Sequence, residues 1–262
     1  MKRILTLGSD IRSNKLSSLS VITFFILWLI LSQLDLINEL ILPSPLRVIL
    51  SIKDVGFVLV YHITATIVRI LIGFTLGVCF GILIGTLMQY FRTMFIILDG
   101  IIETFRPVPP VALVPFFILI FGFSEFGKIL LVVLGTTLVM VVGTIEAIER
   151  IPVGLMRWGL ISGLSRKALF LKVILPASWP EMRGSLRIAM ALAITLVIVS
   201  EFMGASYGLG YLINISKVTL TTPTILLSVI ILGWIGWSFD KLLRLLYSKT
   251  CKWDIRAKGA IQ

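Results

Sequence analysis

Long stretches of almost uninterrupted apolar residues alternate with short polar segments along this chain of 262 residues. A helix needs roughly 20 mostly apolar residues to cross the hydrocarbon layer of a membrane. Because the apolar stretches reach or approach this length, the pattern predicts six transmembrane helices. The predicted helices are 16–34, 55–89, 95–124, 129–145, 188–203 and 218–239.

The composition supports the same conclusion. Hydrophobic residues make up 58% of the chain and charged residues 14%, whereas soluble globular domains contain about 25% charged residues. The first fifteen residues are too polar for a cleaved signal peptide, so we expect the first apolar stretch to be retained as a span. The predicted fold class is therefore an all-α integral membrane protein. Cys79 and Cys251 have neither disulfide nor metal-ligand spacing, so no metal site is predicted.

Lysine and arginine are distributed unequally between the segments that separate the predicted spans. Positive residues near span ends are held on the cytoplasmic side of a membrane. With both termini inside, the inner segments carry 18 of these residues and the outer segments four, which predicts an N-in, C-in topology. The net charge of +11 then faces anionic lipid head groups and the cytoplasm, so nucleic acid is not a predicted partner.

The largest predicted cytoplasmic loop, 146–187, contains seven basic and three acidic residues. Within it, "GLSRKALFLKVILP" from Gly163 to Pro176 is basic and amphipathic. Such a helix either lies on the membrane surface or docks on a partner protein. Proline disfavours helical geometry at the preceding residue, so we expect the helix to stop before Pro176, which would act as a hinge. In the docking interpretation, the residues that fill a partner's groove are Leu164, Ala168, Leu169, Phe170, Val173 and Leu175.

Glycines recur every fourth residue in the second predicted span. Small residues at this spacing allow helices to approach closely in lipid. The stripe is interpreted either as packing within the subunit or as part of a dimer interface. Its members are Gly73, Gly77, Gly81 and Gly85.

Prolines interrupt the third predicted span after Arg106. Prolines at membrane depth are tolerated where protein or a water-filled cavity satisfies the freed carbonyls. Pro110 and Pro115 therefore either line a translocation path or bend the helix. Asp99 and Glu103 share a helix face close to Arg106, and this group is interpreted as a structural ion pair.

Glu201 lies deep in the fifth predicted span, where a carboxylate is costly unless it faces a cavity or a cation. Arg69 is the candidate partner, since it lies at a similar depth in the second span. The pair is either structural or part of a gate or substrate path, to which the adjacent Met203 would also belong. His62 is at the end of a span without a metal-ligand companion, which predicts interfacial anchoring.

No phosphate-binding G-x-x-x-x-G-K-[ST] motif occurs in the sequence, so the chain is not expected to bind ATP by itself. An enzyme embedded in the membrane would need a nucleophile and base or a metal cluster, which one histidine and scattered carboxylates do not provide. A secondary transporter driven by an ion gradient remains the alternative. Such proteins often contain two repeated halves, and no repeat is visible here.

The segment from Gly163 to Ala193 resembles the cytoplasmic loop of the membrane subunits of bacterial ABC importers. Gly163 and the Ile-Leu-Pro at 174–176 match the pattern of that family, whereas its Glu-Ala-Ala is replaced by Arg157, Trp158 and Gly159. Three further segments are similar to the sulfonate, nitrate and taurine branch. They are "LPSP" at 42–45, "RPVPPVALVPFFILIFGFSEFGKI" at 106–129 and "SEFMGASYGLGYLI" at 200–213.

The resemblance implies a type I permease subunit in the bacterial inner membrane. The implied partners are cytoplasmic ABC ATPase subunits, a periplasmic or lipid-anchored substrate-binding protein and a second copy of the chain. ATP and Mg would be bound by the ATPase and no cofactor by this chain. The expected divisions are 1–57, a permease domain at 58–246 and a basic tail at 247–262. The implied ATPase-coupling residues are Arg157, Gly163, Ser165, Arg166, Phe170, Leu175 and Pro176.

Overall fold

The computed structural model describes residues 19, 22–23, 25–32, 34 and 38–250, and the described part of the chain is helical, without strands. The chain divides into two compact units, residues 1–59 with 212–230 and residues 60–211 with 231–262. The predicted span 16–34 falls partly outside the described residues, and those described from 19 to 32 are helical. The tail at 251–262 lies outside them.

The first unit contains the short helix α2, Pro45–Val55, together with parts of three other helices. Ser44 caps the start of α2 by accepting a hydrogen bond from the Arg47 N–H at 3.4 Å. The Thr222 hydroxyl donates to the Leu40 carbonyl at 2.7 Å, which ties the start of α12 to the segment before α2. The helices shared between the units are α3 (Val58–Tyr90), α11 (Leu209–Val218) and α12 (Thr222–Thr250).

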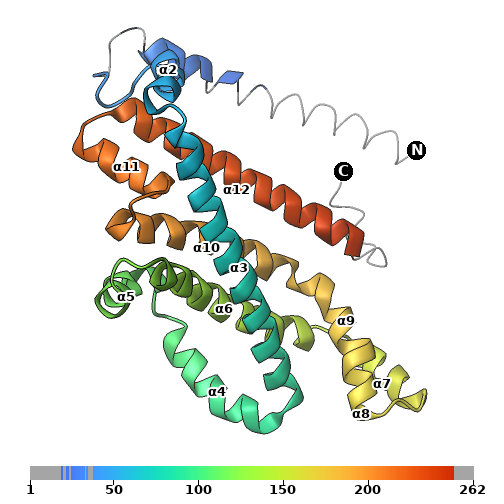
Figure 1. Ribbon diagram of the computed structural model, residues 1–262. Helices are drawn as coiled ribbons and strands as arrows, with labels where there is room; N and C mark the ends of the chain where they lie inside the picture. The colour runs from blue at the N-terminus through green and yellow to red at the C-terminus, as the bar shows by residue number, and fades with distance from the viewer. Residues whose placement is uncertain (1–18, 20–21, 24, 33, 35–37, 251–262) are drawn as a thin grey trace, which may run out of the picture. The chain divides into compact units, whose positions relative to one another are not determined.

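The second unit is built around α6, Glu125–Glu149, and α10, Arg183–Gly204, which make the most extensive helix contact of the chain (Figure 1). Both helices carry small or branched residues that are fully buried, among them Val132 of α6 and Ala193 and Val197 of α10. The remaining helices of this unit are α4 (Arg92–Phe105), η1 (Pro110–Leu113), α5 (Val114–Phe121), α7 (Val153–Ile161), α8 (Arg166–Leu169), η2 (Phe170–Ile174), α9 (Leu175–Ser178) and η3 (Trp179–Met182).

Four helical stretches in the described part of the chain are long and apolar enough to cross a membrane. They are α3, α6, α12 and a continuous stretch from Arg166 to Gly204 that ends with α10. The third predicted span is not one straight helix, because α4 and the η1–α5 segment meet at an angle of 84°. Pro107, Pro109 and Pro110 lie at this bend, where missing N–H groups prevent a regular helix. The two arms together count as one broken span or a re-entrant loop.

Candidate functional site

A network of charged side chains, all buried except Glu125, joins α3, α6 and α10 in the second unit. Arg69 donates from Nη1 to Glu201 Oε1 at 2.6 Å, and its Nε and Nη2 form a two-pronged contact with Glu125 at 2.6 and 2.8 Å. Glu125 also accepts from Lys128 Nζ at 2.9 Å. The guanidinium thus lies between two carboxylates, an arrangement that its planar fork of donors fits well.

Glu201 is 1% exposed, and both of its oxygens are hydrogen-bonded. Thr66 donates to the carboxylate at 2.9 Å, and the Gly210 N–H donates to Oε2 at 2.8 Å. A Cβ atom at Gly208 would collide with this carboxylate, and the φ angle there is +127°. Glycine at 208 is therefore required both by space and by backbone conformation.

The predicted partners Arg69 and Glu201 thus lie together in the structure. The sequence pattern did not reveal the roles of Glu125, Thr66 and the backbone at 207–210, although Glu125 stands three residues before Lys128 at the start of a span. His62 differs from its predicted role as an interfacial anchor, because it is buried and its Nδ1 accepts from the Gly208 N–H at 3.0 Å. The other predicted path residues, Pro110, Pro115 and Met203, are not part of this network.

The glycine stripe of α3 packs against α6 of the same chain. Cβ atoms at Gly73 and Gly85 would lie within 3 Å of the side chains of Val132 and Thr144. Gly77 and Gly81 likewise face Thr136 and Met140. The two helices approach so closely that the Thr137 hydroxyl donates to the Gly77 carbonyl at 3.3 Å. This contact is the intrasubunit alternative considered for the stripe.

At the other end of the second unit, α7 ends in a tight turn at Gly163. The Leu164 N–H donates to the Gly159 carbonyl at 3.2 Å, and the Gly163 N–H donates to the Leu160 carbonyl at 3.0 Å. This is the Schellman arrangement, which places the residue after the helix cap in the left-handed region. Gly163 has φ +77°. Ser165 then caps α8 by accepting from the Ala168 N–H at 3.3 Å.

The helix that begins with α8 does not stop at Pro176, so the predicted helix end is wrong, whereas the role of Pro176 as a hinge stays a prediction. Residues Phe170–Ile174 form a π-helical turn, and Leu175 is helical with φ −63° and ψ −47°. A π turn moves the acceptor carbonyl one residue further back, which makes room for a proline ring and for its missing N–H. The chain therefore continues as one helical stretch from Arg166 to Gly204.

The apolar face of this helix is covered by the same chain. Phe170 is only 7% exposed and meets Tyr90 at 5.1 Å between ring centroids, in an edge-on arrangement. We call the buried cluster around it the loop core, which consists of Ile148, Ile151, Leu169, Phe170 and Ile174. Leu164 and Val173 pack partly buried against it. Four of the six residues predicted to fill a partner's groove thus pack within the same chain: Leu164, Leu169, Phe170 and Val173. The other two, Ala168 and Leu175, are half-buried. Among the predicted coupling residues, Ser165, Arg166 and Pro176 are exposed.

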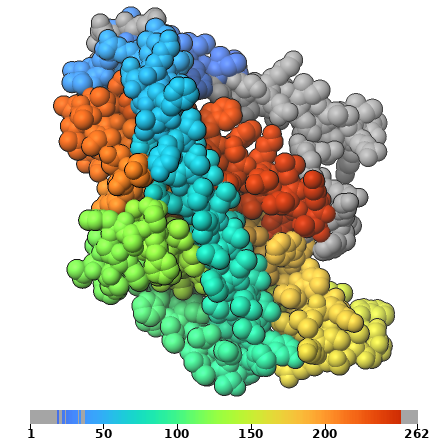
Figure 2. All heavy atoms as spheres, in the orientation of Figure 1, coloured from blue at the N-terminus to red at the C-terminus, as the bar shows by residue number. Residues whose placement is uncertain are grey.

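The exposed apolar surface of this region is on α7 instead. Trp158 is 71% exposed and Ile161 80% exposed, and Arg157 lies exposed beside them. We call Val153, Arg157, Trp158, Leu160 and Ile161 the α7 face. In Figure 2 the α7–α9 segment, in yellow, forms the end of the second unit visible from this side. Through Gly159, whose missing Cβ makes room for Leu169, α7 is packed directly onto the loop core.

The fold is that of the membrane subunits of ABC importers. A structure of the MetNI methionine ABC transporter in an inward-facing conformation has a TM-score of 0.58 at 20% identity, with 74% of this chain and 98% of that chain covered. A crystal structure of an amino acid ABC transporter with histidines has a TM-score of 0.61 at 17% identity, with 76% and 97% covered. At these identities the likeness concerns the fold alone.

The chain belongs to the family of binding-protein-dependent transport system inner membrane components, whose model matches residues 77–249. Its relatives include an aliphatic sulfonates transport permease of Bacillus subtilis, 31% identical over 89% of this chain and 85% of that protein. The taurine transport system permease of Escherichia coli is 30% identical over 86% and 85%. A formylaminopyrimidine transport permease of Halalkalibacterium halodurans is 28% identical over 75% and 79%.

Family membership makes the chain a multi-pass inner-membrane transport component and the permease subunit of an ABC importer, rather than an enzyme. Permeases of this family work together with an ATPase and a binding protein. The alternative of a secondary transporter driven by an ion gradient is therefore set aside.

Proposed function

We propose that the chain forms the membrane path for a small organosulfonate, an aliphatic sulfonate or taurine, which a binding protein delivers. The relatives with 30% identity or more over most of the chain support this cargo class, because three of them carry these substrates in their names. Formylaminopyrimidine is the second candidate, supported by a relative at 28% identity. Uptake of radiolabelled taurine and of the pyrimidine by the reconstituted importer would distinguish the two.

The α7 face is the proposed contact with the ATPase, which would bind ATP and Mg. The observation that carries this assignment is the exposure of Trp158 and Ile161 on a helix that is otherwise fixed to the loop core. Large apolar side chains with a nearby arginine are typical of the energetically important centre of an interface. Because the loop core continues into α6 and α10, movement of α7 would be transmitted to the membrane helices.

Arg157 occupies the place where related loops carry a glutamate. The charge at this contact is therefore reversed, and we expect an acidic side chain on the ATPase opposite Arg157. Exchange of Arg157 for glutamate should weaken the contact, and a compensating basic substitution on the ATPase should restore it. Two copies of the chain, each N-in and C-in, would complete the proposed importer with two ATPase subunits.

The proposal is tested by co-purifying the ATPase with the permease and measuring ATP-dependent uptake in proteoliposomes. The double variant Trp158→Ala, Ile161→Ser should bind the ATPase with an affinity lower by about tenfold or more, since both side chains would become buried in the proposed interface. The matched control is Trp234→Ala on α12, whose indole is also exposed. Unchanged ATPase binding by the double variant, or uptake by the lone chain without ATP, would contradict the proposal.

A further inference from the structure

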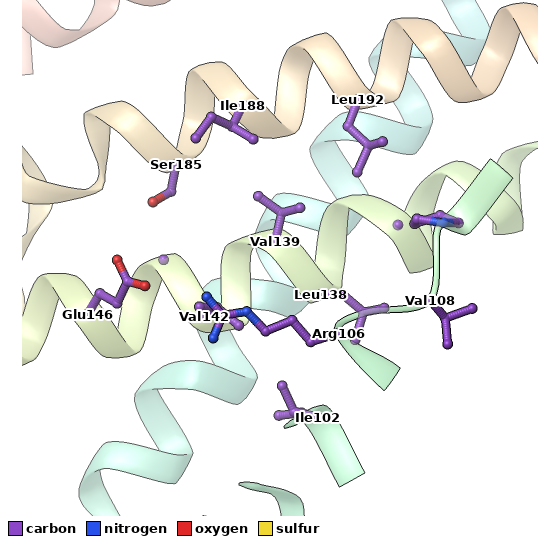
Figure 3. A pocket seen from close by; sticks show the side chains of 13 residues that line it. Ile102, Arg106, Val108, Leu138, Val139, Val142, Glu146, Ser185, Ile188 and Leu192 are labelled. Carbon is purple, nitrogen blue, oxygen red and sulfur yellow. The ribbon is translucent and has the colours of Figure 1, made fainter. Parts of the chain in front are cut away.

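A cavity of about 270 Å³ lies in the second unit between the end of α4, η1, α6 and α10 (Figure 3). Branched side chains from two helices form most of its wall, among them Val139 and Val142 of α6 and Ile188 and Leu192 of α10. Pockets for small molecules typically measure about 300–1,000 Å³. The cavity lies just below this range, so it suits only a very small organic molecule.

Two glycines of α6 determine where the surrounding elements come close. A Cβ atom at Gly143 would collide with Ser185 of α10, and one at Gly135 would collide with Leu196 and lie 3.3 Å from Pro110. The helices are thus in close contact at two positions of α6 and are held apart between them by branched side chains. The cavity results from this packing pattern, which the sequence specifies.

Three polar side chains reach the cavity: Arg106, Glu146 and Ser185. Arg106 follows the last residue of α4, where the helix dipole stabilises a cation. In Figure 3 its side chain extends along α6 toward the end of the cavity that contains Glu146 and Ser185. Its ion pair in the described part of the chain is a single contact of Nη1 with Glu103 at 3.3 Å, and the side chain is 54% exposed.

A guanidinium carries five N–H donors, and one long contact with Glu103 leaves most of them available for another acceptor. The side chain is half exposed, so its binding of an anion depends on these free donors rather than on exclusion of water. Arginine also binds planar or tetrahedral oxyanions through two parallel hydrogen bonds, which lysine cannot do. Glu146, which is itself 3.1 Å from Arg150, offers a carboxylate for an ammonium group at the end of the cavity toward which Arg106 extends.

We propose that this cavity is a cargo-binding site within the permease, where Arg106 binds the sulfonate head of a small organosulfonate. The apolar wall accommodates the short carbon chain, and Glu146 faces the amino group when the cargo is an aminosulfonate. The assignment of the cargo class rests on the proposed function. The site itself rests on the cavity, its glycine-dependent shape and the position of Arg106.

The first test uses the assembled importer with Cys79→Ser and Cys251→Ser and a single reporter, Ile188→Cys. The rate at which this cysteine reacts with the anionic sulfonatoethyl methanethiosulfonate is compared with its rate with the cationic trimethylammonioethyl methanethiosulfonate. Each rate is divided by the rate at which free 2-mercaptoethanol reacts with the same reagent. A positive potential should favour the anionic reagent by about tenfold. Ethanesulfonate should protect the cysteine, and Arg106→Gln should abolish both the preference and the protection. Arg92→Gln, at the start of the same helix, should change neither.

A preference that persists in Arg106→Gln, absence of protection by ethanesulfonate, or a cysteine that reacts with neither reagent would overturn the proposal. The second test measures ATP-dependent taurine uptake. Arg106→Gln should raise the KM about tenfold or more, because a charge-assisted contact is lost, and Arg106→Lys should recover part of it. ATP hydrolysis should remain, since the α7 face is unaltered.

The two proposals fail in different ways. If the cargo class is wrong, the unaltered importer takes up neither taurine nor an alkanesulfonate, although it hydrolyses ATP. If the cavity assignment is wrong, the unaltered importer takes up taurine and Arg106→Gln does so with the same KM. If Glu146→Gln reduced the uptake of taurine more than the uptake of ethanesulfonate, the result would support the proposed position of the amino group. An equal reduction in the uptake of both would contradict it.

Discussion

Arg69 of α3 and Glu201 of α10 are separated by 132 positions in the chain, yet Nη1 and Oε1 lie 2.6 Å apart. The carboxylate has no exposed side-chain surface, and the guanidinium side chain is also buried. Such a pair is tolerated only where hydrogen bonds satisfy the remaining donors and acceptors. Thr66 and the Gly210 N–H supply them for Glu201, while Glu125 and the Tyr207 carbonyl supply them for Arg69.

Glu201→Gln should destabilise the protein strongly. The substitution removes the charge that balances Arg69 in a buried position and points an amide donor or oxygen at unsuited partners. Breaking a buried pair from one side costs about 3–5 kcal/mol. The expected loss appears as a lower free energy of unfolding in mixed detergent micelles. Glu125→Gln is the control, because its side chain is 55% exposed and solvent can replace the lost contact; equal losses would contradict the argument.

The sequence contained enough information for this pair but not for its surroundings. Two opposite charges at similar depth in apolar spans have few alternatives in lipid, so Arg69 and Glu201 could be matched without a structure. The Gly210 N–H and the Tyr207 carbonyl belong to a turn whose path depends on backbone angles at 205–208. Hydrophobic periodicity does not encode such a turn. The hydrogen bond between the Gly208 N–H and His62 was not predicted for the same reason, because Gly208 belongs to this turn.

Gly77→Ala should separate α3 from α6. The added methyl group would overlap the Thr136 side chain and approach the Val133 carbonyl. Overpacking of a tight contact costs about 1–3 kcal/mol, whereas Gly→Ala in an open helical position is favourable by up to about 1 kcal/mol. Gly233→Ala on α12 provides that control, since no atom lies within 4 Å of its added methyl group. Thermal unfolding of both variants distinguishes the effects, and equal midpoints would contradict close packing.

The loop at 146–187, which the resemblance identified as the coupling loop, shows a different limit of prediction from sequence. An amphipathic pattern identified the helix from Gly163 onward and its apolar face. Periodicity does not specify what covers that face, and the structure covers Leu169 and Phe170 with residues of the same chain. The α7 face was less visible because α7 is apolar on nearly all sides, so periodicity does not separate its exposed residues from its buried ones.

Gly163→Val should weaken coupling without filling any occupied space. No atom lies within 4 Å of an added Cβ, but φ is +77°, where a β-branched side chain is strained. The cost is about 1–2 kcal/mol, and relief of the strain would change the angle between α7 and α8. We expect less ATP-dependent uptake per ATP hydrolysed. Gly163→Asn, which tolerates this conformation, should behave nearly as the native chain; similar defects in both variants would argue against a conformational cause.

Pro176→Ala tests whether the proline causes the π-helical turn at 170–174 or merely follows it. Alanine supplies an N–H that could bond to the Lys172 carbonyl and tighten the turn, with a gain of about 1 kcal/mol. Tightening would rotate Phe170 and Leu169 out of the loop core, and burial of each stabilises by about 1.5–3 kcal/mol. Burial therefore outweighs the new hydrogen bond, and the turn should persist. We expect unfolding free energy within about 1 kcal/mol of the native value and normal coupling, whereas Phe170→Ala should cost about 3 kcal/mol or more. If Pro176→Ala lost ATP-dependent uptake while its loop core stayed intact, the result would instead support the prediction that Pro176 is a hinge.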